Sequence, residues 1–201
     1  MSKRKLNNDD ISHFIENDLY IPTRTIWIGP TDSEDFEVNA KMAERAIKNI
    51  HILDSKEELP IEILMLNYGG EVTAGMAIYD AILLCRSFVT IKIFGTASSI
   101  GSVILQAGDK RLLAPNSEVM IHLGSSALPT NHPKENMNTL KQAEKFDLRM
   151  REMYLSKVRE KKPDFTKKQL EDWLNFAKYF SPSEAIEFGL ADGTIETHSK
   201  K

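Results

Sequence analysis

Residues 61–94 read IEILMLNYGGEVTAGMAIYDAILLCRSFVTIKIF, and this stretch decides the fold. The apolar run Ile61–Asn67 predicts a buried strand, which stops at two glycines where the backbone needs conformational freedom. Residues 72–86 carry apolar side chains on one face at helical spacing, and residues 88–94 predict a second strand. A strand, a helix and a strand in this order are typical of parallel pairing, so the stretch predicts an α/β fold.

The flanking segments continue the alternation of strands and helices. The other elements that the sequence predicts are strands at 25–29, 111–114 and 118–122 and helices at 35–53, 98–107 and 134–161. The helix at 134–161 is charged on its surface, so we expect it to project from the core. Thr166 and Ser181 are predicted N-caps of two further helices, and Pro182 suits the first position of the second one. The whole pattern predicts one layered α/β domain with mostly parallel strands.

Length, charge and apolar content restrict the class of protein. The 201 residues suit a single domain, for which we predict a flexible N-terminal segment at 1–20, a main domain at 21–196 and a tail at 197–201. A net charge of −3 argues against a nucleic-acid partner. No apolar run is long enough to span a membrane, no signal peptide is visible, and the single Cys85 cannot form an intramolecular disulfide. These features predict a cytoplasmic protein with no membrane partner.

A serine stands where the second predicted strand gives way to a short helix. The segment Gly95-Thr96-Ala97-Ser98-Ser99-Ile100-Gly101-Ser102 is built of small residues, which would leave the Ser99 hydroxyl accessible. The geometry resembles the nucleophile elbow of serine hydrolases, although Ala97 replaces the first glycine of that motif. A helix capped by Ser98 would explain the same residues without any chemistry.

Two other positions are candidates for taking part in catalysis together with Ser99. The N–H groups of a glycine pair such as Gly69-Gly70 can hold an oxyanion, although a tight turn also explains the pair. His122 ends an apolar strand before a glycine-bearing loop, where it could act as a general base or be purely structural. No histidine pair has metal-ligand spacing, so we expect neither a metal nor another cofactor.

Taken together and in order, these motifs resemble the ClpP family of serine peptidases. The series is Gly69-Gly70 with the segment 71–80 after it, the serine segment around Ser99, residues 115–122 ending in His122, and residues 181–192. The resemblance extends from about residue 61 to residue 192. It implies a crotonase-like spiral of β-β-α units, in which the helix at 134–161 is the projecting handle helix.

The resemblance also implies roles and partners. Ser99 matches the nucleophile and His122 the general base, and the N–H groups of Gly70 and Ile100 match the oxyanion hole. The loop from Gly124 to Pro133 corresponds to the segment that lines substrate and helps to dock a second ring. The family implies a homo-oligomer of heptameric rings stacked face to face, which acts on peptides or unfolded proteins delivered by a hexameric ATPase unfoldase. The sequence lacks a Walker-type loop, so ATP would be used by the partner.

One position departs from the family pattern. An aspartate that orients the histidine normally lies four residues before the serine that opens the last helix, and here that position is Ala177. Asn175 and Asp172 are nearby and are alternative third members. A second departure is Tyr68, where the family usually has proline.

The sequence therefore supports three hypotheses. The leading one is a serine endopeptidase that works through an acyl-enzyme, either slowly or with an unusual third residue. The second is a catalytically weak or inactive ring subunit, which the alanine at position 177 motivates. The third is a crotonase-type enzyme acting on acyl-CoA thioesters, a class that does not need a serine–histidine pair.

Overall fold

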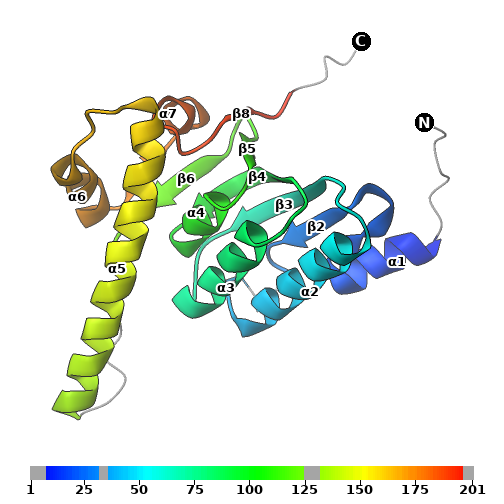
Figure 1. The fold of residues 1–201 in the computed structure, drawn as a ribbon, viewed down its shortest axis with the longest axis horizontal. Helices are drawn as coiled ribbons and strands as arrows, with labels where there is room; N and C mark the ends of the chain where they lie inside the picture. Colours follow the sequence, from blue (N-terminus) through cyan, green and yellow to red (C-terminus); the bar gives the residue numbers. More distant parts are fainter. Residues whose placement is uncertain (1–7, 32–35, 125–131, 197–201) are drawn as a thin grey trace.

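The computed structural model describes residues 8–31, 36–124 and 132–196, which form an α/β fold around one sheet (Figure 1). The strands are β1 (Leu19–Tyr20), β2 (Thr25–Ile28), β3 (Ile61–Asn67), β4 (Val89–Ser98), β5 (Lys110–Leu113), β6 (Glu118–Ile121), β7 (Lys178–Phe180) and β8 (Gly193–Thr194). The α-helices are α1 (Asn8–Asn17), α2 (Ala40–Lys56), α3 (Val72–Leu83), α4 (Ile100–Leu105), α5 (Pro133–Lys161), α6 (Lys167–Asn175) and α7 (Pro182–Glu187), with a 3₁₀ helix at Ile21–Thr23.

Most strands of the sheet are parallel, as the sequence predicts. The main order is β1-β2-β3-β4-β5-β8, in which only β1 pairs antiparallel with its neighbour. Alternate residues of β3 are buried, and they pack with the apolar faces of α2 and α3 in the core. Both helices lie on the same face of the sheet (Figure 1).

Strand β4 has two different neighbours along its length, and this arrangement creates the site described below. Residues Thr90 to Ile93 pair with β5, whereas Thr96 to Ser98 pair with β6. Between these halves the register against β3 shifts, and Gly95 there has a φ of +75°, which a residue with a side chain rarely adopts. The bend at Gly95 therefore directs the end of β4 towards β6.

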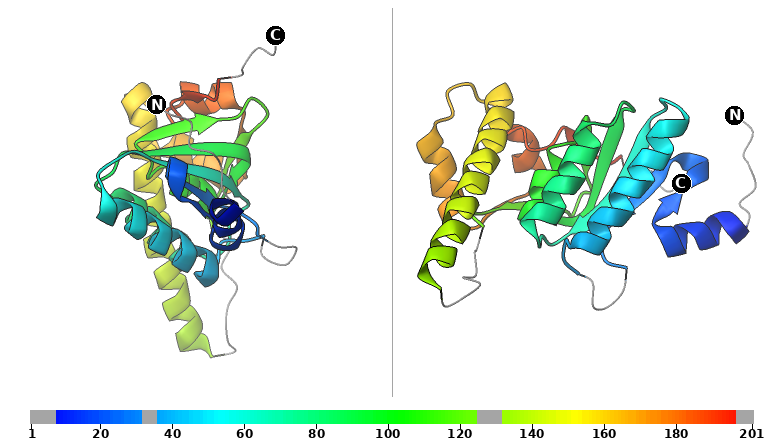
Figure 2. Two further views of the ribbon diagram at one scale, coloured as in Figure 1. Left: turned by 90° about the vertical axis from the view of Figure 1, so that its right-hand side faces the viewer. Right: turned by 60° about the horizontal axis from the view of Figure 1, so that its bottom comes forward.

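The handle helix α5 projects as the sequence predicts. Its N-terminal part extends well beyond the sheet and α3, while its C-terminal part lies against α4, α6 and α7 (Figures 1 and 2). The buried residues of α5 are Met150, Tyr154, Leu155 and Val158, all in its second half. The packed half thus anchors the helix, and the first half contains no fully buried residue.

Several boundaries differ from the sequence-based prediction for local reasons. Helix α2 begins at Ala40 because the side chain of Asn39 accepts the N–H of Met42 as an N-cap. Thr166 and Ser181 each form the predicted cap, in both cases as a complete capping box. Strand β7, which pairs antiparallel with β6, is too short for the sequence pattern to indicate.

The N-terminal segment contains secondary structure that the sequence does not predict. Helix α1 and strand β1 both lie within residues 8–20, and β1 pairs with β2. The flexibility predicted for residues 1–20 and the domain limits at 21–196 stay predictions, and the predicted tail at 197–201 lies outside the described residues. Among the helices in the described part of the chain, none has the length and apolarity needed to span a membrane.

Candidate active site

Three parallel strands end at the same edge of the sheet, and the residues singled out in the sequence follow them directly. Strand β3 leads into Gly69 and Gly70, β4 leads into Ser99, and β6 leads into His122. Parallel pairing of β4 with both β3 and β6 brings these three ends together. Ligands and reactive groups in α/β sheets usually lie at the carboxyl ends of strands, and this edge fits that rule.

Ser99 has an unusual backbone conformation. Its φ is 54° and its ψ is −125°, a combination that costs a non-glycine residue free energy and that persists only where the surroundings impose it. Its N–H donates to the carbonyl of Met120 at 2.9 Å, which ties the turn to β6. The strained turn between a strand and a helix is the geometry of a nucleophile elbow.

The Ser99 hydroxyl contacts His122 and does not cap the helix. The distance from Ser99 Oγ to His122 Nε2 is 2.7 Å, and both residues are half-buried. Ser99 is the N-cap residue of α4, but its side chain makes no capping hydrogen bond. Ser98 bonds instead to Thr96, so the alternative of a helix capped by Ser98 is wrong. Donation by the hydroxyl to Nε2 requires the imidazole tautomer with its proton on Nδ1.

The glycine turn packs directly against Ser99. A β-carbon on Gly69 would lie 2.7 Å from Ser99 Cβ, and Gly69 has a φ of +97°. Asn67, which ends β3, is buried, and its Oδ1 accepts the N–H of Gly69 at 2.9 Å. A β-carbon on Gly101 would lie 2.5 Å from this same Oδ1. The Asn67 side chain therefore fills the space between the glycine turn and α4.

Two backbone N–H groups border the serine without a protein acceptor. Within the described part of the chain, the N–H of neither Gly70 nor Ile100 donates to another residue. Ile100 is the first residue of α4, where N–H groups have no partner within the helix and favour negative charge. Gly70 is exposed and is held by a bridge to Val38 on its other side. Such a pair of donors can bind an anionic oxygen.

The handle helix contacts the serine turn through a chain of hydroxyl groups. Ser102 Oγ donates to the carbonyl of Ser99 at 2.6 Å and lies 2.6 Å from Tyr154 Oη. Because the one proton of Ser102 is used on Ser99, Tyr154 is the donor to Ser102. Burial raises the pKa of Tyr154, so its hydroxyl keeps the proton that it donates to Ser102.

The alanine at position 177 directly precedes β7. Strand β7 pairs with β6 up to Lys178 beside Ile121, and beyond this pair the N–H of Leu123 donates to the carbonyl of Leu174 at 3.0 Å, so the register does not continue to His122. A methyl group cannot accept the imidazole N–H. Asn175 is exposed, and within the described residues it forms no hydrogen bond with His122.

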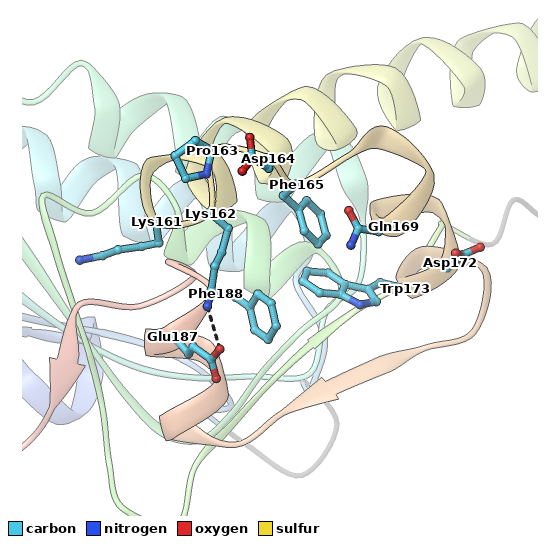
Figure 3. Close-up of a pocket in the computed structure, with 10 residues that line it drawn as sticks. All are labelled: Lys161, Lys162, Pro163, Asp164, Phe165, Gln169, Asp172, Trp173, Glu187 and Phe188. Carbon is cyan, nitrogen blue, oxygen red and sulfur yellow. Dashed lines mark hydrogen bonds and ion pairs between the residues drawn. The ribbon is translucent and has the colours of Figure 1, made fainter.

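Asp172 is exposed and lies at a different pocket. This pocket, of about 630 Å³, is formed by residues of α6 and α7 and by the end of α5, and Asp172 lies there beside Trp173 (Figure 3). Phe165, Trp173 and Phe188 form an aromatic cluster in it, in which Trp173 meets Phe188 edge to face. Lys162 pairs there with Glu187 at 2.8 Å (Figure 3). Within the described residues no contact joins Asp172 to His122, so neither alternative third residue is brought to the imidazole.

A cavity of about 710 Å³ lies between α3 and the handle helix. Its walls include Val72 from the start of α3, Gly124 from the segment after His122, and Phe146 and Asp147 from α5. It therefore connects the segments that follow the glycine turn and the histidine. The predicted substrate-lining loop from Gly124 to Pro133 falls mostly on residues 125–131, which lie outside the described residues.

Sequence reasoning missed three side chains of this site: Asn67, Tyr154 and Asp147. A polar residue at the end of an apolar strand, directly before two glycines, was a signal for Asn67. Nothing local marks the two residues on α5, because their contacts depend on packing between distant segments. The described residues contain no group of three or more His, Cys, Asp or Glu side chains that could hold a metal ion.

Comparison with known proteins places the chain in a family. Residues 30–198 match the Clp protease family. The chain is 35% identical over 185 residues to an ATP-dependent Clp protease proteolytic subunit of Deinococcus radiodurans, covering 89% of this chain and 85% of the relative. It is 32% identical over 168 residues to the chloroplastic proteolytic subunit 3 of Arabidopsis thaliana, covering 80% of this chain but only 51% of that protein.

A solved structure agrees with the sequence relatives. A point mutant of ClpP1 from Listeria monocytogenes superposes with a TM-score of 0.74 at 26% identity, covering 88% of this chain and 94% of that one. The expected ClpP-like architecture with a long handle helix is therefore confirmed. With its strand ends, glycine turn and Ser99–His122 pair arranged on this fold, the chain belongs to the Clp protease family.

Proposed function

We propose that this protein is a serine endopeptidase subunit of a ClpP-like ring, which hydrolyses peptide bonds in unfolded proteins or peptides through an acyl-enzyme. The observation that carries the proposal is the 2.7 Å hydrogen bond between Ser99 Oγ and His122 Nε2 at a strained elbow. A scaffold protein or a thioester-binding crotonase has no need for such a pair. The names of the relatives support peptide hydrolysis.

The geometry supports a definite sequence of steps. Ser99 Oγ attacks the substrate carbonyl carbon while His122 Nε2 takes the hydroxyl proton. The N–H groups of Gly70 and Ile100 hold the oxyanion of the tetrahedral intermediate. His122 then gives its proton to the leaving amine, and a water molecule releases the acyl group from Ser99 by the reverse of these transfers. The cavity between α3 and α5, which Val72 and Gly124 border, offers room for a part of the substrate.

The test is covalent labelling with a fluorophosphonate, followed by mapping of the adduct by mass spectrometry. We expect an adduct on Ser99 in the native protein, none in Ser99→Ala, and at least ~100-fold slower labelling in His122→Ala, since the base is lost. Denatured protein is the control for non-specific reaction. An adduct on another residue, or equal labelling of native and denatured protein, would contradict the assignment.

The assembly belongs to the same proposal. The relative from Deinococcus radiodurans is named as a subunit of an ATP-dependent protease, and on that basis we infer heptameric rings, stacked in pairs, that receive substrate from a hexameric ATPase unfoldase. Native mass spectrometry checks the ring, with an expected mass of seven or fourteen subunits of 22.8 kDa. A stable monomer at micromolar concentration would exclude it.

The second candidate function is a catalytically inactive ring subunit. It is favoured by Ala177, which stands where the family resemblance implies an aspartate and whose methyl group cannot accept a hydrogen bond from His122. Both candidates predict a ring, and they differ in labelling: an assembled ring that does not react at Ser99 would support the inactive subunit and exclude the peptidase.

A further inference from the structure

The side chain of Asn67 lies between the two segments that carry the N–H groups of Gly70 and Ile100. Asn67 ends β3 and is 1% exposed. Its Oδ1 accepts the N–H of Gly69 at 2.9 Å, which closes the turn that asparagine side chains form with the residue two positions on. A β-carbon on Gly101, the residue after Ile100, would lie 2.5 Å from the same oxygen. One amide group therefore contacts the backbone beside both N–H donors.

The glycine turn depends on hydrogen bonds for its shape. Gly69 and Gly70 have φ values of +97° and +142°, and a glycine backbone is conformationally free unless it is held. The carbonyl of Gly69 accepts the N–H of Val38, and the N–H of Glu71 donates to the carbonyl of Val38, both at 2.7 Å. Because the C=O and N–H of a trans peptide point in opposite directions, the Gly70 N–H points away from residue 38. Val38 thus fixes one peptide of the turn, and Asn67 fixes the peptide before it.

The amide group of Asn67 is held in one orientation. Its Nδ2 donates to the sulfur of Met42 on α2 at 3.7 Å, and its oxygen faces the Gly69 N–H. The close contact with Gly101 leaves no space between the amide and α4. A buried polar side chain with partners for both its oxygen and its nitrogen restricts the groups that it bonds. The Asn67 side chain can therefore hold the glycine turn in a fixed position relative to α4.

We propose that Asn67 is a positioning residue of the oxyanion hole, because its amide fixes the turn that carries the Gly70 N–H relative to the start of α4, which carries the Ile100 N–H. This inference rests on the proposed peptidase function. Donors that are fixed before the reaction stabilise the charge that develops on the substrate oxygen without any reorganisation. Asn67 is too deeply buried to contact a substrate, so it acts only through the backbone.

Asn67→Leu and Asn67→Ser separate the hydrogen bond from the volume of the side chain. Leucine has nearly the shape of asparagine but no acceptor, whereas the shorter serine can still accept the N–H two residues on. With a fluorogenic peptide we expect the kcat of Asn67→Leu to fall by about 30- to 100-fold and KM to stay within about twofold, because the oxyanion forms only in the transition state. The kcat of Asn67→Ser should stay within about fivefold of the native value.

Asn49→Leu is the matched control. Asn49 of α2 is also buried, with 5% exposed, and its Nδ2 donates to the carbonyl of Asn17 at 2.7 Å. Leucine at position 49 removes a hydrogen bond of the same kind, so urea unfolding should show a similar loss of stability while kcat stays within about twofold of the native value. If Asn49→Leu loses as much kcat as Asn67→Leu, or if the two variants at position 67 have equal kcat, the proposal is wrong.

Amide hydrogen exchange tests the same contact without any turnover. Mass spectrometry with fragmentation to single residues measures the exchange rate of the Gly69 N–H. We expect this rate to be at least about tenfold faster in Asn67→Leu than in the native protein and in Asn49→Leu. Equal rates would overturn the inference even if the native protein labels at Ser99. A faster rate, together with a native protein that does not label, would uphold the contact and reject the peptidase function.

Discussion

Gly69 lies so close to Ser99 that even a methyl group there would collide with the Ser99 side chain. The added β-carbon would be 2.7 Å from Ser99 Cβ at a φ of +97°, so clash and backbone strain act together. We expect Gly69→Ala to lower the free energy of unfolding by about 2 to 3 kcal/mol and to abolish fluorophosphonate labelling of Ser99. Urea unfolding and the labelling assay measure the two effects.

The control at the residue scale is Gly193→Ala. A β-carbon on Gly193 would lie 3.5 Å from Leu112 Cδ2, an ordinary contact, and the φ of Gly193 is not positive. The unfolding free energy of the Gly193→Ala protein should stay within about 0.5 kcal/mol of the native value. Native stability combined with full labelling in Gly69→Ala would show that the turn does not constrain Ser99.

At the scale of elements, α5 is joined to the serine turn by the Tyr154 hydroxyl. Tyr154→Phe removes the donor to Ser102 but keeps the ring in the core, so we expect a loss of about 1 kcal/mol, measured by thermal unfolding. Labelling of Ser99 should also slow, because Ser102 holds the Ser99 carbonyl. Tyr179→Phe, on the exposed side of β7, should change neither quantity.

The elements themselves follow from the sequence, whereas their mutual positions depend on long-range packing. The alternation of Ile61, Ile63 and Met65 is enough to predict β3, and the local pairs Thr166–Gln169 and Ser181–Glu184 are enough to cap α6 and α7. The apolar pattern of β4 ends at Phe94, yet the strand continues to Ser98 because Gly95 allows a bend towards β6.

The same limit on prediction from the sequence applies to the residues of the candidate site. Ser99, His122, Gly70 and Ile100 stand next to strand ends that the sequence marks clearly, and the family resemblance implies that they meet. Asp147 lies in a long run of charged residues on α5, 25 positions after His122 in the chain. Its position beside Gly124 in the cavity between α3 and α5 results from packing between segments far apart in the sequence, which no local pattern reports.

At the scale of the whole molecule, an ion pair between a buried arginine and a partly exposed aspartate connects the centre of the chain to its C-terminal part. Arg111 of β5 is 5% exposed in its side chain, and its guanidinium donates to Asp192 Oδ1 at 2.6 Å and to Oδ2 at 3.0 Å. It also donates to Gln106 at 2.5 Å and to the carbonyl of Gly189 at 3.0 Å. Burial alone would raise the pKa of Asp192, but the bonds and charge of Arg111 outweigh it and hold that pKa below its ordinary value.

Asp192→Asn should therefore destabilise the protein in a pH-dependent way. We expect a loss of about 2 to 4 kcal/mol at neutral pH, since a buried guanidinium loses its counter-charge. A lowered carboxyl pKa stabilises the fold at all pH values above the unfolded pKa of about 3.9 and stops doing so as pH falls through the folded value. The difference in unfolding free energy between the native protein and Asp192→Asn should thus be constant near neutrality and shrink below about pH 4.

Urea unfolding at pH values from neutrality to below about pH 4 measures this difference in unfolding free energy. Glu187→Gln, which breaks the exposed pair with Lys162, should cost less than about 0.5 kcal/mol at every pH. A gap between native protein and Asp192→Asn that widens on acidification would contradict the assignment of the ion pair.

The alanine at position 177 has a consequence for how this chain can change over generations. Because Ala177 stands where the family resemblance implies an aspartate, one substitution there would supply the carboxylate without changing the length of the chain. Alanine codons that end in a pyrimidine become aspartate codons by a single base change. An arrangement with a carboxylate at this position and the arrangement found here are therefore neighbouring genotypes, and a selection for peptide hydrolysis could convert one into the other in one mutational step.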